Sequence, residues 1–304
     1  MPAVYTNNIE LNQPLFEAVT RWYDDYDGQR FDIGVTSLIG PPRIRMLKKR
    51  HKYEVDASDM IFILFGKLGH MLLERHSDED AFHEERLVYE LDGWRVGGQA
   101  DRWAQYKVEG VSIVEDYKFT SLWTFIDGVK PEWKRQLEFY KWLFVRAANL
   151  KVDFGRIWAF YRDWSKRKRH GSNYPKYQVG KYDVSLRSVD KIERDVLERI
   201  KLHQSCVDLP DDDLPECTPE ERWERPTTWA VMKKGRKSAM RLLDSKEEAE
   251  KWKDLNGGDE IVKRPGESVR CLDYCEVMPF CSVAKRLGIT PIEEGQDDVK
   301  TDQS

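Results

Sequence analysis

The chain has 304 residues, which allows one large domain or one domain with a smaller appendage. Apolar residues make up 40% of the chain and charged residues 34%, so we expect a modest core and a heavily ionised surface. The longest apolar run, residues 60–65, is far shorter than the roughly 18 residues of a membrane-spanning helix, and 12% aromatic residues exclude general disorder. The first residues lack the basic and apolar regions of a signal peptide, so we expect a cytoplasmic, reducing environment and no membrane partner.

The net charge is −4, but the basic residues are segregated along the chain. Residues 41–52 hold six Lys or Arg and no acid, and residues 156–181 hold eight against the single acid Asp163. Residues 230–241 hold five more and again no acid. Basic patches with aromatic neighbours are typical of nucleic-acid binding, whereas the alternative for any one patch is a solvated loop.

The first part of the chain predicts short elements before a longer helix. We expect a helix at 14–26, a short strand at 31–42 that ends in the Pro41-Pro42 turn, and a basic helix at 43–52. Residues 59–75 place apolar side chains at the i, i+3, i+4 and i+7 positions, which predicts a buried helix.

The middle of the chain predicts an α/β sheet. Three extended runs come first, and Asp92-Gly93 between the first two is a strong hairpin signal. A helix, two more strands and a second helix follow. The expected strands are 85–91, 94–103, 111–119, 154–161 and 177–183, and the expected helices are 131–150 and 189–206.

The last third of the chain differs in composition from the rest. Residues 208–219 are acidic and contain proline, as in a linker. A basic strand-like stretch at 229–243 and a helix at 245–255 follow, and the chain ends in an acidic segment. We therefore expect an α/β domain at 1–206, a cysteine-rich module at 207–288 and a disordered tail at 289–304.

Two of the predicted strands bring carboxylates together. Asp101 lies near the end of a strand of small residues, and the next strand carries Asp116 and Lys118. Residues i and i+2 of a strand share one face, so Asp116 and Lys118 should point the same way, while Glu115 points to the other face. Two carboxylates can hold Mg²⁺ or Mn²⁺, and a neighbouring ammonium can stabilise the charge of a phosphoryl transition state. This arrangement suits phosphodiester cleavage.

Further residues occur in a recognisable order around this pair. His70 follows Gly66 by four residues, Gly98 precedes Asp101 by three, and Gln136 and Tyr140 share one face of the next helix. Together, G-x3-H, G-x2-D, D-x-K and Q-x3-Y resemble the RecB-like branch of the PD-(D/E)xK nucleases. The resemblance covers residues 33 to 160. Each piece is weak alone, but the order and spacing match that branch.

The resemblance implies a fold and a site. The fold would be a restriction-endonuclease-like α/β core with a central mixed sheet flanked by helices, followed by a small metal-bound module. The metal would be held by His70, Asp101, Asp116 and the Tyr117 carbonyl group. Lys118 would be the catalytic lysine, and Gln136 and Tyr140 would position Lys118 or the DNA. Taken alone, His70 and Gln136 would more often be ordinary core or surface residues, and Tyr140 also fits the apolar stripe of its helix.

The cysteines are a second candidate metal site. Cys271, Cys275 and Cys281 form a C-x3-C-x5-C run, and Cys217 or Cys206 would supply the fourth ligand. Relatives in the RecB-like branch carry an iron–sulfur cluster that uses one cysteine before the nuclease motifs and three after them. This chain has no cysteine before those motifs. We favour Cys217, because Cys206 ends an amphipathic helix. The centre would be [4Fe-4S], with Zn²⁺ or unrelated buried thiols as alternatives.

The predicted function is a metal-dependent DNA exonuclease of phage or bacterial recombination and repair, in the host cytoplasm if phage-encoded. By the resemblance, its partners would be duplex ends or single strands of DNA and a recombinase or single-strand annealing protein. The alternatives are a CRISPR-adaptation-type nuclease, a non-catalytic DNA-binding module, and another phosphohydrolase or an RNase. The expected DNA contacts lie in one basic loop and are Arg162, Lys166, Arg167, Lys168 and Arg169.

Overall fold

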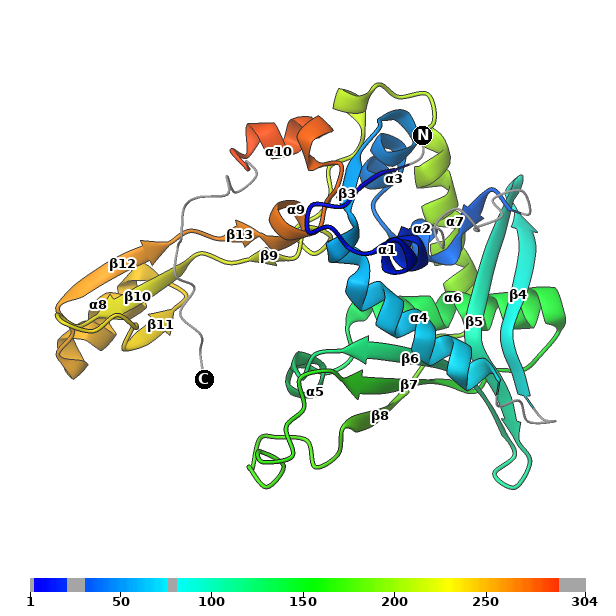
Figure 1. The fold of residues 1–304 in the computed structure, drawn as a ribbon, viewed down its shortest axis with the longest axis horizontal. Helices are drawn as coiled ribbons and strands as arrows, with labels where there is room; N and C mark the ends of the chain where they lie inside the picture. Colours follow the sequence, from blue (N-terminus) through cyan, green and yellow to red (C-terminus); the bar gives the residue numbers. More distant parts are fainter. Residues whose placement is uncertain (1–2, 21–30, 76–80, 290–304) are drawn as a thin grey trace. The chain divides into compact units, whose positions relative to one another are not determined.

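The computed structural model describes residues 3–20, 31–75 and 81–289 (Figure 1). The chain forms two compact units. Among the described residues, the larger unit contains those of 3–45 and 54–208, and the smaller contains those of 46–53 and 209–289. Residues 21–26 of the first expected helix and residues 290–304 of the expected tail lie outside the described residues.

The larger unit is built on a mixed β-sheet. Its strands are β2 (Ile33–Gly34), β4 (Ala81–Leu91), β5 (Trp94–Tyr106), β6 (Val111–Thr120), β7 (Phe154–Tyr161) and β8 (Val179–Val184). Within the described residues the order is β2-β5-β6-β7-β8, with β4 also paired to β5. The β6–β7 and β2–β5 pairs are parallel and the other pairs are antiparallel. The expected mixed α/β sheet is confirmed.

Two local signals explain this connectivity. Asp92 and Gly93 have φ angles of 52° and 74°, as a tight two-residue hairpin requires, so the predicted β4–β5 hairpin is confirmed. Parallel β6 and β7 need a crossover, which α5 (Trp123–Asp127) and α6 (Pro131–Ala148) supply. Proline at the first position of α6 and Asn149 in the left-handed conformation after it mark the ends of the predicted helix.

Helices flank the sheet and enclose the main core. The core joins the sheet to α6, to α7 (Val189–Ser205) and to α2 (Val35–Ile39). The helix α2 replaces most of the strand that was expected at 31–42, so that prediction is wrong beyond β2. Val35 and Leu38 are both buried at helical spacing, which favours a helix before the Pro41-Pro42 turn.

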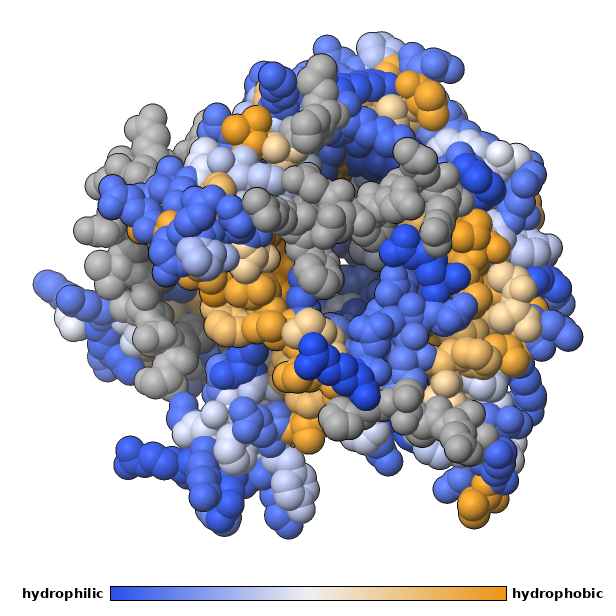
Figure 2. All heavy atoms as spheres, turned by 45° about the vertical axis from the view of Figure 1, so that its right-hand side comes forward, coloured by the Kyte–Doolittle hydropathy of each residue, from blue (hydrophilic) through white to orange (hydrophobic). Residues whose placement is uncertain are grey.

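The helix expected at 59–75 forms as α4 (Ile61–Glu74), but its expected burial is wrong. No residue of α4 is buried, and its apolar side chains are among the exposed ones: Phe62, Ile63, Phe65, Leu68 and Leu72. Close contact with the sheet is made at Gly69, where an added Cβ would meet the Phe119 ring at 2.0 Å. Apolar patches are visible at the surface on the face of the molecule shown in Figure 2.

The remaining elements before residue 61 are short. They are β1 (Val4–Thr6), which pairs in parallel with β3 (Glu54–Asp56), the helices α1 (Gln13–Thr20) and α3 (Pro42–Arg50), and the 3-10 helix η2 (Ala57–Met60). The expected basic helix at 43–52 corresponds to α3. No helix among the described residues is long and apolar enough to cross a lipid bilayer.

The smaller unit contains short strands and helices. They are η3 (Asp211–Asp213), β9 (Glu224–Arg225), β10 (Thr228–Met232), β11 (Arg241–Leu243), α8 (Lys246–Asn256), β12 (Glu260–Arg264), β13 (Glu267–Ser268), α9 (Val269–Asp273), η4 (Met278–Phe280) and α10 (Ser282–Arg286). The basic strand-like stretch expected at 229–243 contains the two strands β10 and β11.

Ion pairs tie the end of α3 to the rest of this unit. Lys48 lies 2.9 Å from Glu276, and Asp211 accepts hydrogen bonds from Arg50 at 2.7 Å and His51 at 2.5 Å. The His51 ring also stacks on Phe280. These members of the 41–52 basic patch therefore have acidic partners within the protein.

A buried histidine links α7 to the last turn of α2 in the larger unit. His203 is fully buried, and its Nε2 lies 3.2 Å from the Leu38 carbonyl oxygen, to which it can only donate. Its Nδ1 has no hydrogen-bond partner among the described residues. Burial, reinforced by the positive charges of Arg199 and Arg45, lowers the pKa of His203 to about 4. The folded protein therefore holds this imidazole neutral.

We predict that this histidine makes stability pH-dependent. Between pH 6.5 and about 4 the unfolded chain binds a proton at His203 and the folded chain does not, so stability falls as the pH falls, by up to about 3 kcal/mol. Urea unfolding across this range should show the fall in the wild type and a smaller one in His203→Gln. His170→Gln, at an exposed histidine, is the control; equal slopes in all three proteins would contradict the prediction.

Candidate functional site

The candidate site lies where the pairing of β5 is interrupted. One edge of β5 pairs with β4. The other edge pairs with β2 at Val96 and Gly97 and with β6 from Arg102 to Tyr106. Residues 98–101 of that edge therefore pair with neither strand. The last β5–β6 pair is Arg102 with Glu115, so Asp101 and Asp116 are the next residues in register, where the two strands separate.

The carboxylate of Asp101 spans this interruption. Its Oδ2 accepts a hydrogen bond from the Tyr117 backbone N–H of β6 at 2.5 Å, and its Oδ1 lies 3.3 Å from His70 Nδ1. The residue is only 9% exposed. Asp101 thus satisfies a backbone donor where the ladder ends and still presents its second oxygen to α4.

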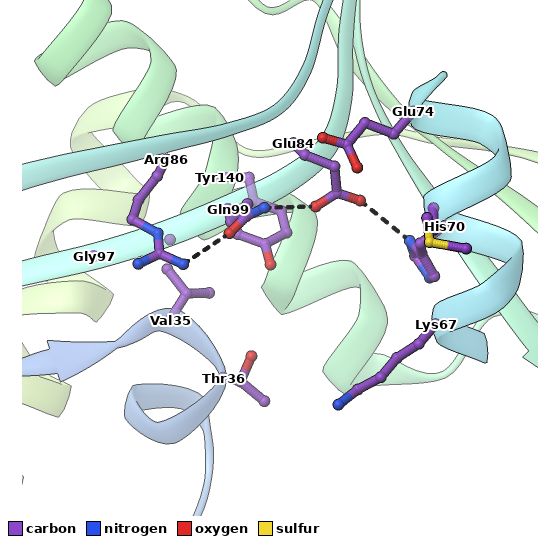
Figure 3. Close-up of a pocket in the computed structure, with 12 residues that line it drawn as sticks. Val35, Thr36, Lys67, His70, Glu74, Glu84, Arg86, Gly97, Gln99 and Tyr140 are labelled. Carbon is purple, nitrogen blue, oxygen red and sulfur yellow. Dashed lines mark hydrogen bonds and ion pairs between the residues drawn. The ribbon is translucent and has the colours of Figure 1, made fainter. Parts of the chain in front are cut away.

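Glu84 is a functional candidate that the sequence reasoning missed. It is the residue of β4 opposite Asp101, between the pairs His83–Arg102 and Glu85–Ala100. Its φ of 48° is unusual for a side-chain-bearing residue inside a strand. Its Oε1 lies 3.4 Å from His70 Nδ1, and its Oε2 accepts a hydrogen bond from Gln99 at 2.9 Å (Figure 3).

His70 lies between these two carboxylates. The close approach at Gly69 brings α4 onto Phe119, and the His70 ring contacts the Tyr117 and Phe119 rings. At Gly66, the glycine of the G-x3-H motif, an added Cβ would have no neighbour within 4 Å. The position that needs glycine for close packing is therefore Gly69 and not Gly66. Burial opposes protonation of His70, but hydrogen bonds and charge interactions with Asp101 and Glu84 outweigh it and raise its pKa to about 10.

His70, Glu84 and Asp101 form the one group of three or more metal-binding side chains whose ligand atoms lie within 4.8 Å of one another in the described parts of the chain. One imidazole and two carboxylates suit a divalent cation such as Mg²⁺ or Mn²⁺. A metal bound here would have to displace the His70 proton, because a metal ligates the neutral imidazole.

Asp116 and Lys118 form a separate pair on β6. Lys118 Nζ lies 2.7 Å from Asp116 Oδ2, which confirms that the two side chains point the same way. Burial, only partly offset by Lys118, raises the pKa of Asp116 to about 6. His70 and Asp101 meet with Glu84, and Asp116, which Lys118 holds, lies within electrostatic reach of both Asp101 and His70. The expected ligation of a metal by Asp116 and by the Tyr117 carbonyl group stays a prediction.

A chain of hydrogen bonds extends from Lys118 to α6. Lys118 donates to Gln136 Oε1 at 3.0 Å, and Gln136 Nε2 donates to the Tyr140 hydroxyl at 3.0 Å. Glu115 takes no part in this chain, because it pairs with Arg102 and accepts from Trp158 on the other face of β6. The structure thus brings Asp116, Lys118, Gln136 and Tyr140 together in one connected set.

A cavity of about 520 Å³ opens beside this site (Figure 3). It is lined by residues of α2, α4, β4, β5 and α6, namely Val35, Thr36, Lys67, His70, Met71, Glu74, Glu84, Arg86, Gly97, Gly98, Gln99 and Tyr140. Gly98 is required by packing, since a Cβ there would lie under 3 Å from Leu143 and Val35. His70, Glu84 and Tyr140 join this cavity to the two side-chain sets described above.

The loop between β7 and β8 carries the expected DNA contacts. Lys166, Arg167, Lys168 and Arg169 are exposed, and Arg162 lies over the Phe62 ring at 4.4 Å. Trp164 donates to the Pro175 carbonyl group and so fastens the base of the loop. Contact of this loop with DNA stays a prediction.

The five cysteines occur in two settings, one buried and four partly buried. Cys206 is buried at the end of α7, where its thiol donates to the Leu202 carbonyl group. Burial, followed by the nearby charges of Glu221 and the other three cysteines, raises the pKa of Cys217 to about 12. The thiols of Cys217, Cys271, Cys275 and Cys281 therefore lie within electrostatic reach of one another.

Comparison with known proteins gave only distant similarities. No family model and no curated protein matches the chain. Among solved structures, the chain is similar to SSO0001, with a TM-score of 0.42 and 19% identity over 62% of this chain and 84% of the other. It is also similar to LHK-Exo, solved in complex with dAMP, with a TM-score of 0.32 and 10% identity over 57% of this chain and 92% of the other. The assignment of chemistry therefore depends on the geometry of the site.

Proposed function

We propose that the protein is a metal-dependent nuclease that hydrolyses phosphodiester bonds of DNA. The observation that carries the proposal is the assembly of His70, Glu84 and Asp101 beside the Asp116–Lys118 pair at the interruption of the β5 edge. The motif order in the sequence supports the same reading. Exonuclease action and a role in recombination or repair come from the family resemblance and are part of the proposal.

The chain's own residues divide the chemistry between them. His70, Glu84 and Asp101 would hold Mg²⁺ or Mn²⁺, which when bound would polarise the phosphate and lower the pKa of a water molecule. The Lys118 ammonium, held by Asp116 and Gln136, is placed to stabilise the negative charge that develops on the phosphate. Asp116, whose pKa burial raises above that of an ordinary carboxyl group, would accept a proton from the attacking water.

We predict metal-dependent cleavage of linear DNA by the purified protein. Asp116→Asn should lose cleavage by at least about 100-fold, because general-base help and charge placement each contribute factors of that order. Lys118→Met should lose cleavage to a similar extent. Glu115→Gln, which alters the other face of β6, should cleave DNA at the rate of the wild type. Linear and circular duplexes with Mg²⁺ or Mn²⁺ are the substrates.

The outcomes separate the alternatives. Cleavage of linear but not circular DNA supports an exonuclease. DNA binding without any metal-dependent product would instead support the non-catalytic binding module, and cleavage confined to RNA would support an RNase. Undiminished cleavage by Asp116→Asn and Lys118→Met would contradict the proposed site.

We also predict that the double variant Lys166→Gln/Lys168→Gln binds DNA more weakly than the wild type, because the β7–β8 loop would lose two phosphate contacts. Unchanged DNA binding would show that the loop is exposed to solvent and does not contact DNA.

We propose that Cys217, Cys271, Cys275 and Cys281 hold one iron–sulfur cluster, with zinc as the alternative. Burial raises the pKa of Cys275 to about 11, so this thiol is protonated at neutral pH in the absence of a positive centre. Three cysteines in one run with a fourth distant in the sequence suit a [4Fe-4S] cluster, and the Cys217 thiol interacts electrostatically with the other three.

We predict that Cys275→Ala removes this centre and Cys206→Ala does not. Protein purified without oxygen should be brown and contain iron and sulfide, and Cys275→Ala should lose both the colour and the metal. Because such a centre stabilises its module by on the order of 10 kcal/mol, the variant should also become sensitive to proteolysis after residue 209. Colourless protein with stoichiometric zinc would establish the alternative. Folded, metal-free wild type would contradict both.

A further inference from the structure

The segment between β9 and β13 has no role in the proposed nuclease site or the cysteine centre. β9 and β13 are antiparallel, with Arg225 opposite Glu267, so residues 226–266 leave and return at neighbouring points of the chain. This insertion, which we call the hairpin module, contains β10, β11, α8 and β12 (Figure 1). It separates Cys217 from Cys271 in the sequence without supplying a cysteine.

The hairpin module has its own packing. Its three strands form an antiparallel sheet in the order β11-β10-β12, and α8 packs against all three. Ser245 caps the start of α8 by accepting the Glu248 N–H, and Gly257, at a φ of 76°, ends it. Gly258 then lies so close to Val231 that a Cβ would meet that side chain at 2.3 Å. These contacts pack the β10–β11 hairpin against β12 and α8.

The tip of this hairpin is strongly basic. Residues 228–243 hold five Lys or Arg and no acid. Four of the five lie in the turn between the strands and are exposed: Lys233, Lys234, Arg236 and Lys237. None of these four side chains forms an ion pair with any described residue. Asp259 lies beside this turn, but its carboxylate accepts a hydrogen bond from the Lys234 backbone N–H, at 2.7 Å.

The turn presents these charges on a fixed backbone. Arg236 N–H donates to the Lys233 carbonyl group at 3.0 Å, and Gly235 takes a φ of 83° between them. Met240 N–H donates to the Val231 carbonyl group at 2.8 Å and closes the hairpin. A two-stranded β-ribbon fits the major groove of duplex DNA. Basic side chains on such a ribbon can contact the phosphates on either side of the groove.

The aromatic residues of the module argue against a single-stranded ligand. Proteins that grip single strands stack bases on exposed aromatic rings. Trp229 and Trp252 are both partly covered, and Lys263 lies over the Trp229 ring at 5.8 Å. We propose that the β10–β11 hairpin is a separate duplex-DNA-binding element that contacts the phosphate backbone through Lys233, Lys234, Arg236 and Lys237. This assignment is independent of catalysis and stands if the nuclease proposal fails.

The test compares two double variants that remove the same charge from the module. Lys234→Gln/Lys237→Gln neutralises the tip, and Lys246→Gln/Lys251→Gln neutralises exposed lysines of α8. Duplex affinity is measured against salt without divalent metal, so that no cleavage occurs. The tip variant should lose affinity about tenfold or more near 0.1 M salt, and its log–log salt slope should fall by about 1.8, or about 0.9 per phosphate contact. The α8 variant should match the wild type.

Three results would overturn the proposal. They are an unchanged salt slope in the tip variant, an equal loss in the α8 variant, and an equal loss of affinity for single-stranded DNA. Far-UV circular dichroism and resistance to proteolysis within residues 226–266 establish that both variants keep the fold. Failure of the nuclease proposal would appear separately, as absent cleavage by a protein that still binds duplex DNA through the tip.

Discussion

The candidate site depends on the interruption in the pairing of β5. A continuous β5–β6 ladder would place Asp101 and Asp116 as ordinary cross-strand neighbours and would leave no room for a ligand between the strands. Instead, β2 and β6 share one edge of β5 and leave residues 98–101 unpaired between them. A buried backbone N–H without a hydrogen-bond partner costs free energy. The Asp101 carboxylate removes this cost by accepting a hydrogen bond from the Tyr117 backbone N–H. The fold thus supplies both the opening and the reason for an acid at its edge.

The charges of the site stabilise one another. Asp116 is 2% exposed and keeps Lys118 at 2.7 Å, while His70 lies between Asp101 and Glu84. A buried carboxylate without a cation carries a large desolvation cost. In the absence of metal, the protonated His70 supplies the positive charge that Asp101 and Glu84 need. A bound divalent cation would supply that positive charge instead. Asp101 and Glu84 can therefore lie close together both with and without a bound cation.

Much of this arrangement follows from sequence, and the exceptions have physical causes. The Asp92-Gly93 turn and the i, i+2 spacing of Asp116 and Lys118 are local rules, and the structure confirms both. Glu84 was missed although the hairpin register alone pairs it with Asp101. The burial of α4 was predicted wrongly because periodicity shows that a helix has an apolar side but not what covers it. Gly69, which sets the position of His70, depends on a contact with Phe119 distant in the sequence.

The central claim is that His70, Glu84 and Asp101 form a divalent-cation site, and Mn²⁺ titration of matched variants tests it most directly. Glu84 points toward His70, whereas its neighbour Glu85 is exposed and outside the group. Glu84→Gln should weaken Mn²⁺ binding by about tenfold or more, and Glu85→Gln should leave it unchanged. Equal Mn²⁺ affinity in the wild type and both variants, with all three folded, would contradict the account.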